Sequence, residues 1–268
     1  MIDYSDFSVV IQGLPFTSNF SNTYIQAKNI KKWFNGTLIL STWEGVKLPL
    51  NHSFDSVVFS LDPGSVVINN KNSNINRQLI SSLAGIKAAK TEYVIKIRSD
   101  NYIELNSDIL KKIRMLGKQS IMSFNVTCKN PAKSNLYCHF SDWVLIGKKE
   151  TMINLFSVPN QLKTSNLSAE QHIFFNYALQ KYEDKISLQL AHEFLSNFIL
   201  IESYKKIKLK SIKPGYFRIP FGINGLHGYL CEELEGKSKM LIKIIMFKEL
   251  IIYRLIQFFL RVKSKYDL

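Results

Sequence analysis

The sequence predicts an α/β protein with a Rossmann-type, mostly parallel sheet flanked by helices. Short, apolar, β-branched runs of strand length alternate with segments whose apolar residues recur at helical spacing. Most of the runs end in polar residues, as strands do where loops leave a parallel sheet. With 268 residues, 46% of them hydrophobic, the chain is large enough for one full core.

The charge balance indicates a partner that carries phosphate groups. The chain has 35 Lys and Arg against 21 Asp and Glu, a net charge of +14, which suits nucleic acid, an anionic membrane or a phosphorylated small molecule. The 3 cysteines fit neither a disulfide framework nor a zinc site. The acidic start Met1–Asp6 differs from a signal peptide. We therefore expect a reducing, cytoplasmic location.

The first quarter of the chain supplies three strands and one helix. Strands are expected over 7–13, 37–43 and 56–64, each closed by polar or turn-forming residues. A helix over 24–34 follows the first strand, with Asn22 among its possible caps and Gly36 at its end. The order of strand, helix and strand starts a parallel sheet.

A second helix is expected over 77–90, after an Asn-rich loop over 69–76. Asn76 can cap this helix, which places Arg77 in the first turn. A cation there opposes the helix dipole unless an anion lies at the same end. Arg77 therefore indicates either an anion site or a solvated arginine at a frayed helix end.

The stretch Tyr93–Glu104 carries the strongest signal for a site. Its apolar strand over 93–97 breaks off in Arg98, Ser99 and Asp100. Ligands of open α/β sheets bind at the edge where such strands end. A carboxylate there can hold a divalent cation and a guanidinium can hold phosphate, which suits a diphosphate-metal substrate. The alternative is that Arg98 and Asp100 only pair with each other.

The alternation continues in the second half. A helix over 108–118, strands over 121–126 and 137–147, and a helix over 151–156 are expected. Ser168 and Gln171 then have the spacing of a capping box, which places Glu170 in the first turn of a helix. The simpler interpretation of Glu170 is a good helix start. Beyond it, we expect a helix over 193–200 and a lysine-protected edge strand over 205–213.

We divide the chain into a domain over 1–236 and a C-terminal segment over 237–268. Several cations of the segment share a narrow sector of a helical wheel, and apolar residues fill most of the rest: Lys243, Arg254, Arg261 and Lys265. No charge-free run approaches the ~18 residues that a spanning helix needs. We expect a basic amphipathic helix on an anionic membrane surface, or, as the alternative, packing on the domain or a second subunit.

Six short motifs, taken in order over about residues 7 to 180, resemble the WavE family of lipopolysaccharide-synthesis proteins. They are Ser41-Thr42-Trp43, Leu61-Asp62-Pro63-Gly64, Asn76-Arg77-Gln78, Ala84-Gly85-Ile86-Lys87, Lys96-Ile97-Arg98-Ser99-Asp100 and Ser141-Asp142-Trp143. The resemblance implies a GT-A-type glycosyltransferase with a nucleotide-sugar donor. It also implies a glycan or lipid-linked acceptor for lipopolysaccharide, O-antigen or capsule synthesis, at the inner face of the cell membrane.

The resemblance also suggests roles for individual residues. Asp100 matches the carboxylate of the Asp-x-Asp motif that faces Mg²⁺ or Mn²⁺, but Arg98 replaces the first Asp, so the motif is incomplete. Arg98 is then expected to neutralise the diphosphate in place of part of the metal's charge, which makes a requirement for metal uncertain. Glu170 resembles the catalytic base of inverting enzymes, with Asp142 in reserve. His227 is the candidate for a late metal or diphosphate contact.

The remaining donor contacts are expected at the ends of the first three strands. Gln12, Thr42 and Asp62 would border the base and ribose, while Arg77 and Arg98 would hold phosphate. A nucleic-acid-binding protein is the competing class, although the sequence has no recognition helix, RNP-like strand or zinc module. A nucleotidyl- or phosphotransferase that uses the same sheet edge is the second alternative.

Overall fold

The computed structural model describes residues 3–211, apart from gaps at 16–21, 69–70, 127, 130, 132–135, 163–164, 183–185, 204–206 and 208–209. Three expectations fall outside these residues: His227, the domain boundary at 236 and the amphipathic helix over 237–268. They stay predictions.

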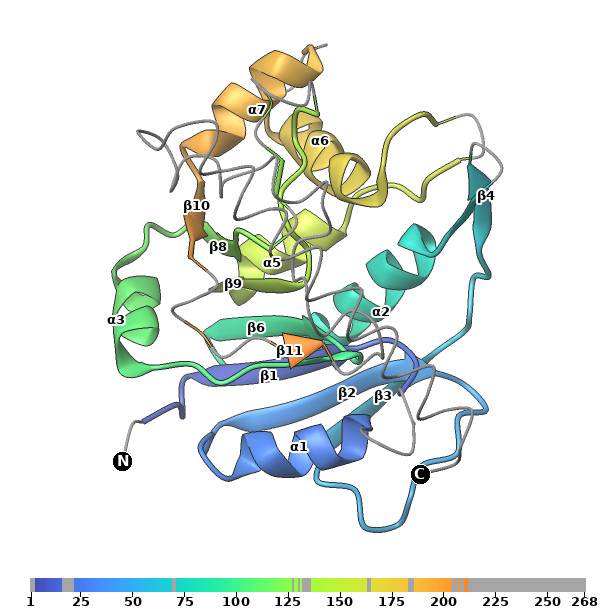
Figure 1. The fold of residues 1–268 in the computed structure, drawn as a ribbon, viewed down its shortest axis with the longest axis vertical. Helices are drawn as coiled ribbons and strands as arrows, with labels where there is room; N and C mark the ends of the chain where they lie inside the picture. The colour runs from blue at the N-terminus through green and yellow to red at the C-terminus, as the bar shows by residue number, and fades with distance from the viewer. Residues whose placement is uncertain are drawn as a thin grey trace, which may run out of the picture.

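A seven-stranded sheet in the order β10-β8-β9-β6-β1-β2-β3 forms the centre of the molecule (Figure 1). Its strands are β1 (Phe7–Gln12), β2 (Thr37–Trp43), β3 (Ser56–Ser60), β6 (Tyr93–Arg98), β8 (Ile121–Phe124), β9 (Val144–Lys148) and β10 (Ile199–Glu202). All neighbouring pairs are parallel except the two that β9 makes with β6 and β8. The expected mostly parallel α/β sheet is confirmed.

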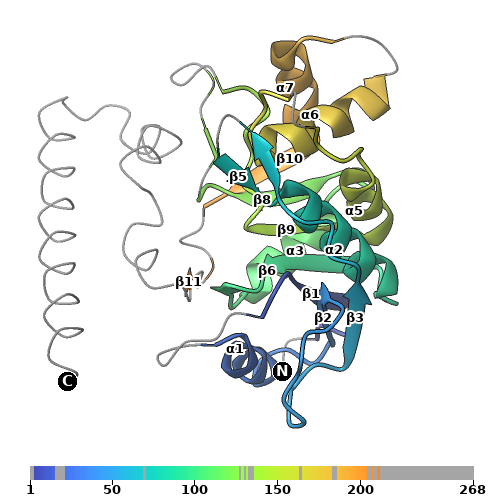
Figure 2. The same ribbon diagram turned by 90° about the vertical axis from the view of Figure 1, so that its right-hand side faces the viewer.

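Helices cover both faces of this sheet (Figure 2). They are α1 (Thr23–Lys31), α2 (Ile75–Ala88), α3 (Ser107–Met115), α5 (Lys149–Phe156), α6 (Ala169–Tyr182) and α7 (Leu188–Ser196). One core cluster joins α1 and α3 to the sheet, and a second cluster joins α2, α5, α6 and α7 to the opposite face. No helix in the described part of the chain combines the length and apolar character needed to cross a bilayer.

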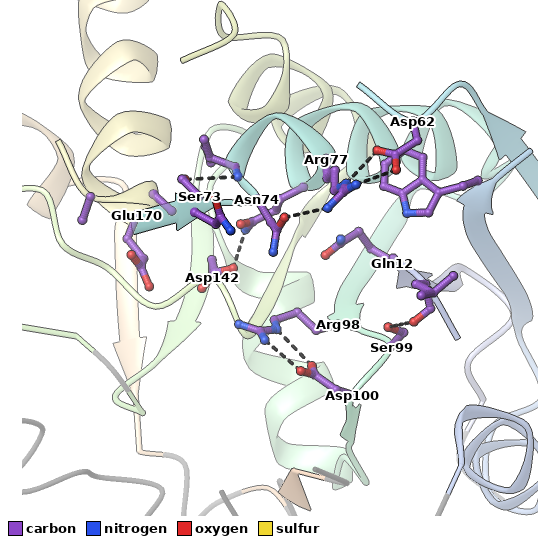
Figure 3. A pocket seen from close by; sticks show the side chains of 18 of the residues that line it. Gln12, Asp62, Ser73, Asn74, Arg77, Arg98, Ser99, Asp100, Asp142 and Glu170 are labelled. Atoms are coloured by element: carbon purple, nitrogen blue, oxygen red, sulfur yellow. Dashed lines mark hydrogen bonds and ion pairs between the residues drawn. The ribbon is translucent and has the colours of Figure 1, made fainter. Parts of the chain in front are cut away.

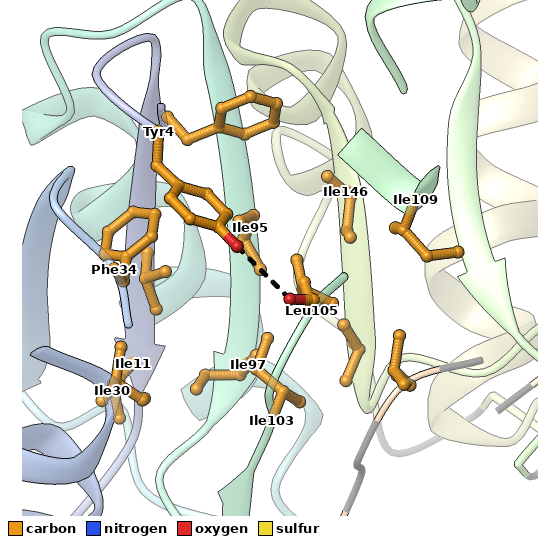
Figure 4. Packing of buried hydrophobic residues seen from close by; sticks show 14 of the residues in the cluster. Tyr4, Ile11, Ile30, Phe34, Ile95, Ile97, Ile103, Leu105, Ile109 and Ile146 are labelled. Atoms are coloured by element: carbon orange, nitrogen blue, oxygen red, sulfur yellow. Dashed lines mark hydrogen bonds between the residues drawn. The ribbon is translucent and has the colours of Figure 1, made fainter. Parts of the chain in front are cut away.

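Alternation of side chains along the central strands builds the two cores. Ile95 and Ile97 of β6 belong to the cluster that α1 and α3 cover, whereas Val94 belongs to the cluster of α2 and α5. Figure 4 shows the first cluster, in which the hydroxyl of Tyr4 donates to the carbonyl of Leu105 at 3.3 Å. Full burial of each large apolar side chain contributes about 1.5–3 kcal/mol, so both clusters fix the helices on the sheet.

Two small sheets were not expected. β4 (Val66–Ile68) and β5 (Lys71–Ser73) form an antiparallel hairpin in and before the Asn-rich stretch that was expected to be a loop. β7 (Asn101–Tyr102) pairs antiparallel with β11 (Lys210–Ser211), which lies within the expected edge strand over 205–213. These strands have only two or three residues each, which is too short for hydrophobic periodicity to reveal them.

Helix ends show where local signals gave the wrong residue. Helix α2 starts at Ile75, and Asn76 is not its cap but accepts from the backbone N–H of Gln161 at 2.7 Å. Helix α1 ends at Lys31, before Gly36. A Cβ at Gly36 would lie 2.4 Å from the Phe7 carbonyl. This glycine therefore permits a close backbone approach rather than ending the helix.

Candidate active site

A cleft of about 1380 Å³ opens at the carboxyl edge of the sheet. The ends of β1, β2 and β6 line it, together with the start of α2, the start of α6 and the approach to β9. It brings together most of the residues expected at the site (Figure 3): Gln12, Asp62, Arg77, Arg98, Asp100, Asp142 and Glu170. Residues up to 158 positions apart in sequence, from Gln12 to Glu170, therefore share one cavity.

Strand register explains this gathering. Gln12, the last residue of β1, is opposite Arg98 of β6 on one side and Ser41 of β2 on the other. Strand β9 runs against β6, with Val144 opposite Ile97. The antiparallel strand therefore begins where β6 ends, and Asp142, just before β9, reaches the same edge.

Thr42 was expected at the cleft but does not line it. Thr42 is fully buried, and its neighbour Trp43 lines the cleft instead. Side chains alternate along β2, so Ser41 and Trp43 share the face that α2 covers, where a Cβ at Gly85 would lie 2.8 Å from that of Ser41. Thr42 points to the opposite face.

Asp62 and Arg77 pair with each other across the cleft wall. Nε and Nη2 of Arg77 each donate to one oxygen of Asp62 at 2.7 Å, and Nη1 donates to the side chain of Asn74 at 2.9 Å. The hydrogen bonds from Arg77 hold the pKa of Asp62 below its ordinary value. A cation in the first turn of α2 was expected to need an anion nearby. That anion is Asp62, a side chain of the protein itself.

Arg98 and Asp100 also form a bidentate ion pair at the end of β6. Nε of Arg98 donates to one oxygen of Asp100 at 3.0 Å and Nη2 donates to the other at 2.8 Å. The guanidinium lies 5.6 Å from the centre of the Trp143 ring. Burial disfavours its charge, but Asp100 and Asp142 outweigh burial and raise the pKa of Arg98 above its ordinary value. Arg98 is therefore a permanent cation in the cleft.

Asp142 is held from behind by a buried lysine. Nζ of Lys96, which is fully buried on β6, donates to the Asp142 carbonyl at 2.6 Å and lies 3.7 Å from its carboxylate. Gln78 of α2 donates to the same carboxylate. Desolvation lowers the pKa of Lys96 to about 8, against the opposing effect of Asp142. A cleft carboxylate is thus fixed in position by two neighbouring elements.

Glu170 lies in the first turn of α6, as the capping box predicted. The backbone N–H of Gln171 donates to the Ser168 hydroxyl at 3.2 Å, and the Gln171 side chain accepts from the N–H of Ser168 at 3.3 Å. Nε2 of His139 lies 3.7 Å from the Glu170 carboxylate. Burial, and then the charge of Asp142, raise the pKa of Glu170, which suits a group that accepts a proton near neutral pH.

A divalent metal does not fit the described residues. In the ranges that the structure describes, no three His, Cys, Asp or Glu side chains are grouped so as to hold a metal ion. Both oxygens of Asp100, the expected metal ligand, already accept from Arg98. These residues supply a guanidinium where the Asp-x-Asp pattern would supply a second carboxylate.

Several residues at or behind the cleft were not chosen from the sequence, among them Trp43, Gln78, Lys96 and His139. Lys96 left a signal, because a lysine inside an apolar strand must find a buried partner. Trp43 and Gln78 each stand beside a residue that was chosen, so only their faces were unknown. His139 left no signal in sequence, since its contact with Glu170 depends on tertiary packing.

The sequence matches the family model for WavE lipopolysaccharide synthesis over residues 7–213. No curated protein matches it at a significant level. Solved structures of similar fold include a mutant of the Drosophila β1,4-galactosyltransferase 7 in complex with manganese, UDP-Gal and xylobiose. That structure shares 12% identity and a TM-score of 0.38, over 78% of this chain and 71% of that chain.

Two further structures are similar at the same level. An active-site mutant of LgtC has 10% identity and a TM-score of 0.39, over 74% of this chain and 73% of its own. HddC from Yersinia pseudotuberculosis, complexed with GMP-PN, has 14% identity and a TM-score of 0.37, over 78% of this chain and 94% of its own. Likenesses of this size concern the fold alone.

Proposed function

The chain belongs to the WavE lipopolysaccharide synthesis family, and we propose from this that it is a glycosyltransferase. It would move a sugar from a nucleotide-sugar donor to a glycan or lipid-linked acceptor. One observation carries the proposal: a single cleft at the carboxyl edge of the sheet contains two arginines and a carboxylate of raised pKa, Arg77, Arg98 and Glu170. Cations suit a diphosphate leaving group, and such a carboxylate suits a general base.

The donor would bind along the ends of β1, β2 and β6. Gln12 is 8% exposed and lines the cleft, and its side-chain oxygen has no hydrogen-bond partner among the described residues. A buried acceptor without a partner is costly, so a base or ribose N–H or O–H at this place would satisfy it. Trp43 adds an aromatic surface beside Gln12 in the same cleft.

In the proposed reaction, Glu170 accepts the proton of an acceptor hydroxyl as that oxygen attacks the anomeric carbon. The bond from this carbon to the diphosphate oxygen breaks, and its electron pair leaves with the nucleoside diphosphate. Arg98 faces the negative charge that develops on this leaving group, so it stabilises the transition state more than the bound donor. A single displacement of this kind inverts the anomeric configuration.

We place this activity at the inner face of the cell membrane. The net charge of +14 and the basic amphipathic pattern over 237–268 support an anionic membrane surface as a partner. A lipid-linked acceptor would be held at the same surface.

The first test is a thermal-shift screen of nucleotide sugars on the full chain. A donor that binds only the folded protein raises its melting temperature, so one nucleotide class should stabilise the protein and the others should not. Strongly salt-dependent binding of oligonucleotides, with no response to any nucleotide sugar, would instead support a nucleic-acid-binding protein.

Glu170→Gln tests the base. The variant should keep the thermal shift with the donor and lose about 10²–10⁴-fold in transfer rate, measured as released nucleotide. Glu150 offers a matched control, because it also lies in the first turn of a helix but is exposed on α5. Glu150→Gln should change neither quantity. Near-normal turnover of Glu170→Gln would move the role of base to Asp142.

A further inference from the structure

We propose that Arg98 takes the place of the divalent metal at the donor diphosphate, so that this protein binds its donor without a metal ion. The inference rests on the proposed function, because it concerns the same cleft. It follows from the hydrogen bonds of Arg98, from the carboxylates around it and from its difference from Arg77.

The hydrogen bonds of Asp100 are the first step. Both of its oxygens accept from one guanidinium, at 3.0 and 2.8 Å, and its side chain is only 8% exposed. A metal at Asp100 would have to displace a charge-assisted, bidentate bond in a nearly closed position. Asp100 therefore acts as the anchor of Arg98 rather than as a ligand.

The surrounding carboxylates are the second step. Asp100, Asp142 and Glu170 all act on the charge of Arg98, and Figure 3 shows the Arg98 side chain lying between Asp142 and Asp100. These three carboxylates favour the charged form of one cation. That cation is a covalently attached guanidinium, which cannot be removed by a chelator.

The difference between the two cleft arginines is the third step. Arg77 uses all three of its side-chain nitrogens, with Asp62 on two and Asn74 on the third. Arg98 uses Nε and Nη2 for Asp100, and in the part of the chain described here no acceptor bonds to Nη1. A guanidinium has five N–H donors, so Arg98 keeps donors for a phosphate. Its side chain is 34% exposed and lines the cleft.

Calorimetric titration of the full chain with UDP and with GDP tests the inference. Each titration is made once with EDTA and once with excess Mn²⁺. The Kd of the nucleotide that binds should agree between the two conditions within about threefold. Arg98→Ala should weaken binding about 10- to 100-fold in both, as expected when charge-assisted hydrogen bonds are lost. Arg98→Lys keeps a positive charge but loses the bidentate geometry of the guanidinium. Its Kd should lie between the Kd of wild type and that of Arg98→Ala.

Arg114 provides a matched control on the opposite face of the sheet. It makes the same kind of bidentate ion pair, with Asp6 at 2.9 and 2.7 Å, and its guanidinium lies 5.3 Å from the Phe7 ring. Arg114→Ala should leave binding within about twofold of wild type.

Two results would overturn the inference in distinguishable ways. If EDTA weakens wild-type binding about tenfold or more, a metal carries the diphosphate charge, and the proposed function stands while the inference fails. If no nucleotide binds in these titrations and no nucleotide sugar stabilises the protein in the thermal-shift screen, the proposed function fails as well. The wild-type comparison does not depend on the folding of any variant.

Discussion

At the scale of single residues, Lys96 is a lysine buried inside the sheet on β6. Its ammonium is fully buried, which disfavours its charge, yet Asp142 lies 3.7 Å away and favours it. A buried pair of this kind contributes little compared with apolar packing, but the loss of one partner leaves the other charge without compensation. Lys96 therefore holds Asp142 in place at the cleft.

Lys96→Met should lower the free energy of unfolding by about 3–5 kcal/mol near pH 7, because it leaves the Asp142 carboxylate without its cation. Denaturant titration measures the change. Lys148→Met removes a cation from a partly exposed pair with Glu92 and should cost clearly less than Lys96→Met. Equal effects of the two variants would contradict the account.

The lowered pKa of Lys96 also makes stability depend on pH. The folded protein releases this proton near pH 8, whereas the unfolded chain keeps it to the ordinary value of 10.5. In this window the unfolded state binds more protons, so the contribution of Lys96 to stability rises with pH between the two values. The same titrations, repeated across this window, should show that the rise is absent in Lys96→Met.

Glu170 should set the acidic limb of the pH–rate profile. It must be deprotonated to act as a base, and its pKa is raised, so activity should fall off at a higher pH than for an ordinary glutamate. Among the described residues, the charged or titratable groups that interact with it include Asp142, His139, Arg98, Lys129 and Cys128.

Asp142→Asn removes the negative charge that raises this pKa, so the acidic limb should move to lower pH. The measurement is kcat/KM for released nucleotide across the pH range. Asp62→Asn changes another cleft carboxylate, which does not act on Glu170 in this way, and should leave the position of the limb unchanged. An unmoved limb in Asp142→Asn would exclude Glu170 as the group observed.

At the scale of elements, the close contact of α2 with the sheet positions Arg77 and Gln78. A Cβ at Gly85 would lie 2.5 Å from Val10 and 2.8 Å from Ser41, so α2 can approach β1 and β2 only because this residue has no side chain. The start of the same helix then carries the two cleft residues to the edge where the strands end.

Gly85→Ala should therefore destabilise the protein by about 1–3 kcal/mol through overpacking, and denaturant titration measures the loss. The nearest contact of a Cβ at Gly117 would be the Ser120 hydroxyl at 3.5 Å. Gly117→Ala should thus change stability by no more than about 0.5 kcal/mol. If both substitutions are neutral, α2 has room to move and does not fix the cleft.

The strands and helices were largely predictable because their signals are local. Strand β2 spans the expected 37–43, and Ser168 and Gln171 form the expected capping box. The direction of β9 was not predictable, since hydrophobic periodicity is the same in both directions. The antiparallel direction of β9 brings Asp142 to the cleft. The closeness of Asp142 to Arg98 therefore could not be predicted from their spacing in the sequence.

The faces of the central strands were equally hidden. Strand β2 is buried on both sides, so it lacks the alternation of polar and apolar residues that assigns a face. Thr42 was therefore chosen where Trp43 lines the cleft. The ion pair between Asp62 and Arg77 was also not predictable. The sequence indicated that both residues lie at the site, but not that they contact each other.

At the scale of the whole molecule, the sheet gathers distant residues at one edge, and helices pack on both of its faces. The two core clusters cover both faces of the sheet, while the carboxyl ends of parallel strands line the cleft. The proposed transfer depends on this placement, because the contacts to the donor, the base and the leaving group must all lie within one cavity.

Hydrogen–deuterium exchange of the full chain, with and without the nucleotide sugar that stabilises it most, tests this placement directly. Bound donor should slow exchange in the segments that line the cleft, 12–15, 43–46, 98–100 and 168–171. If protection is absent from these segments, or appears only at 205–213 and beyond, the donor does not bind at the sheet edge and the central claim is wrong.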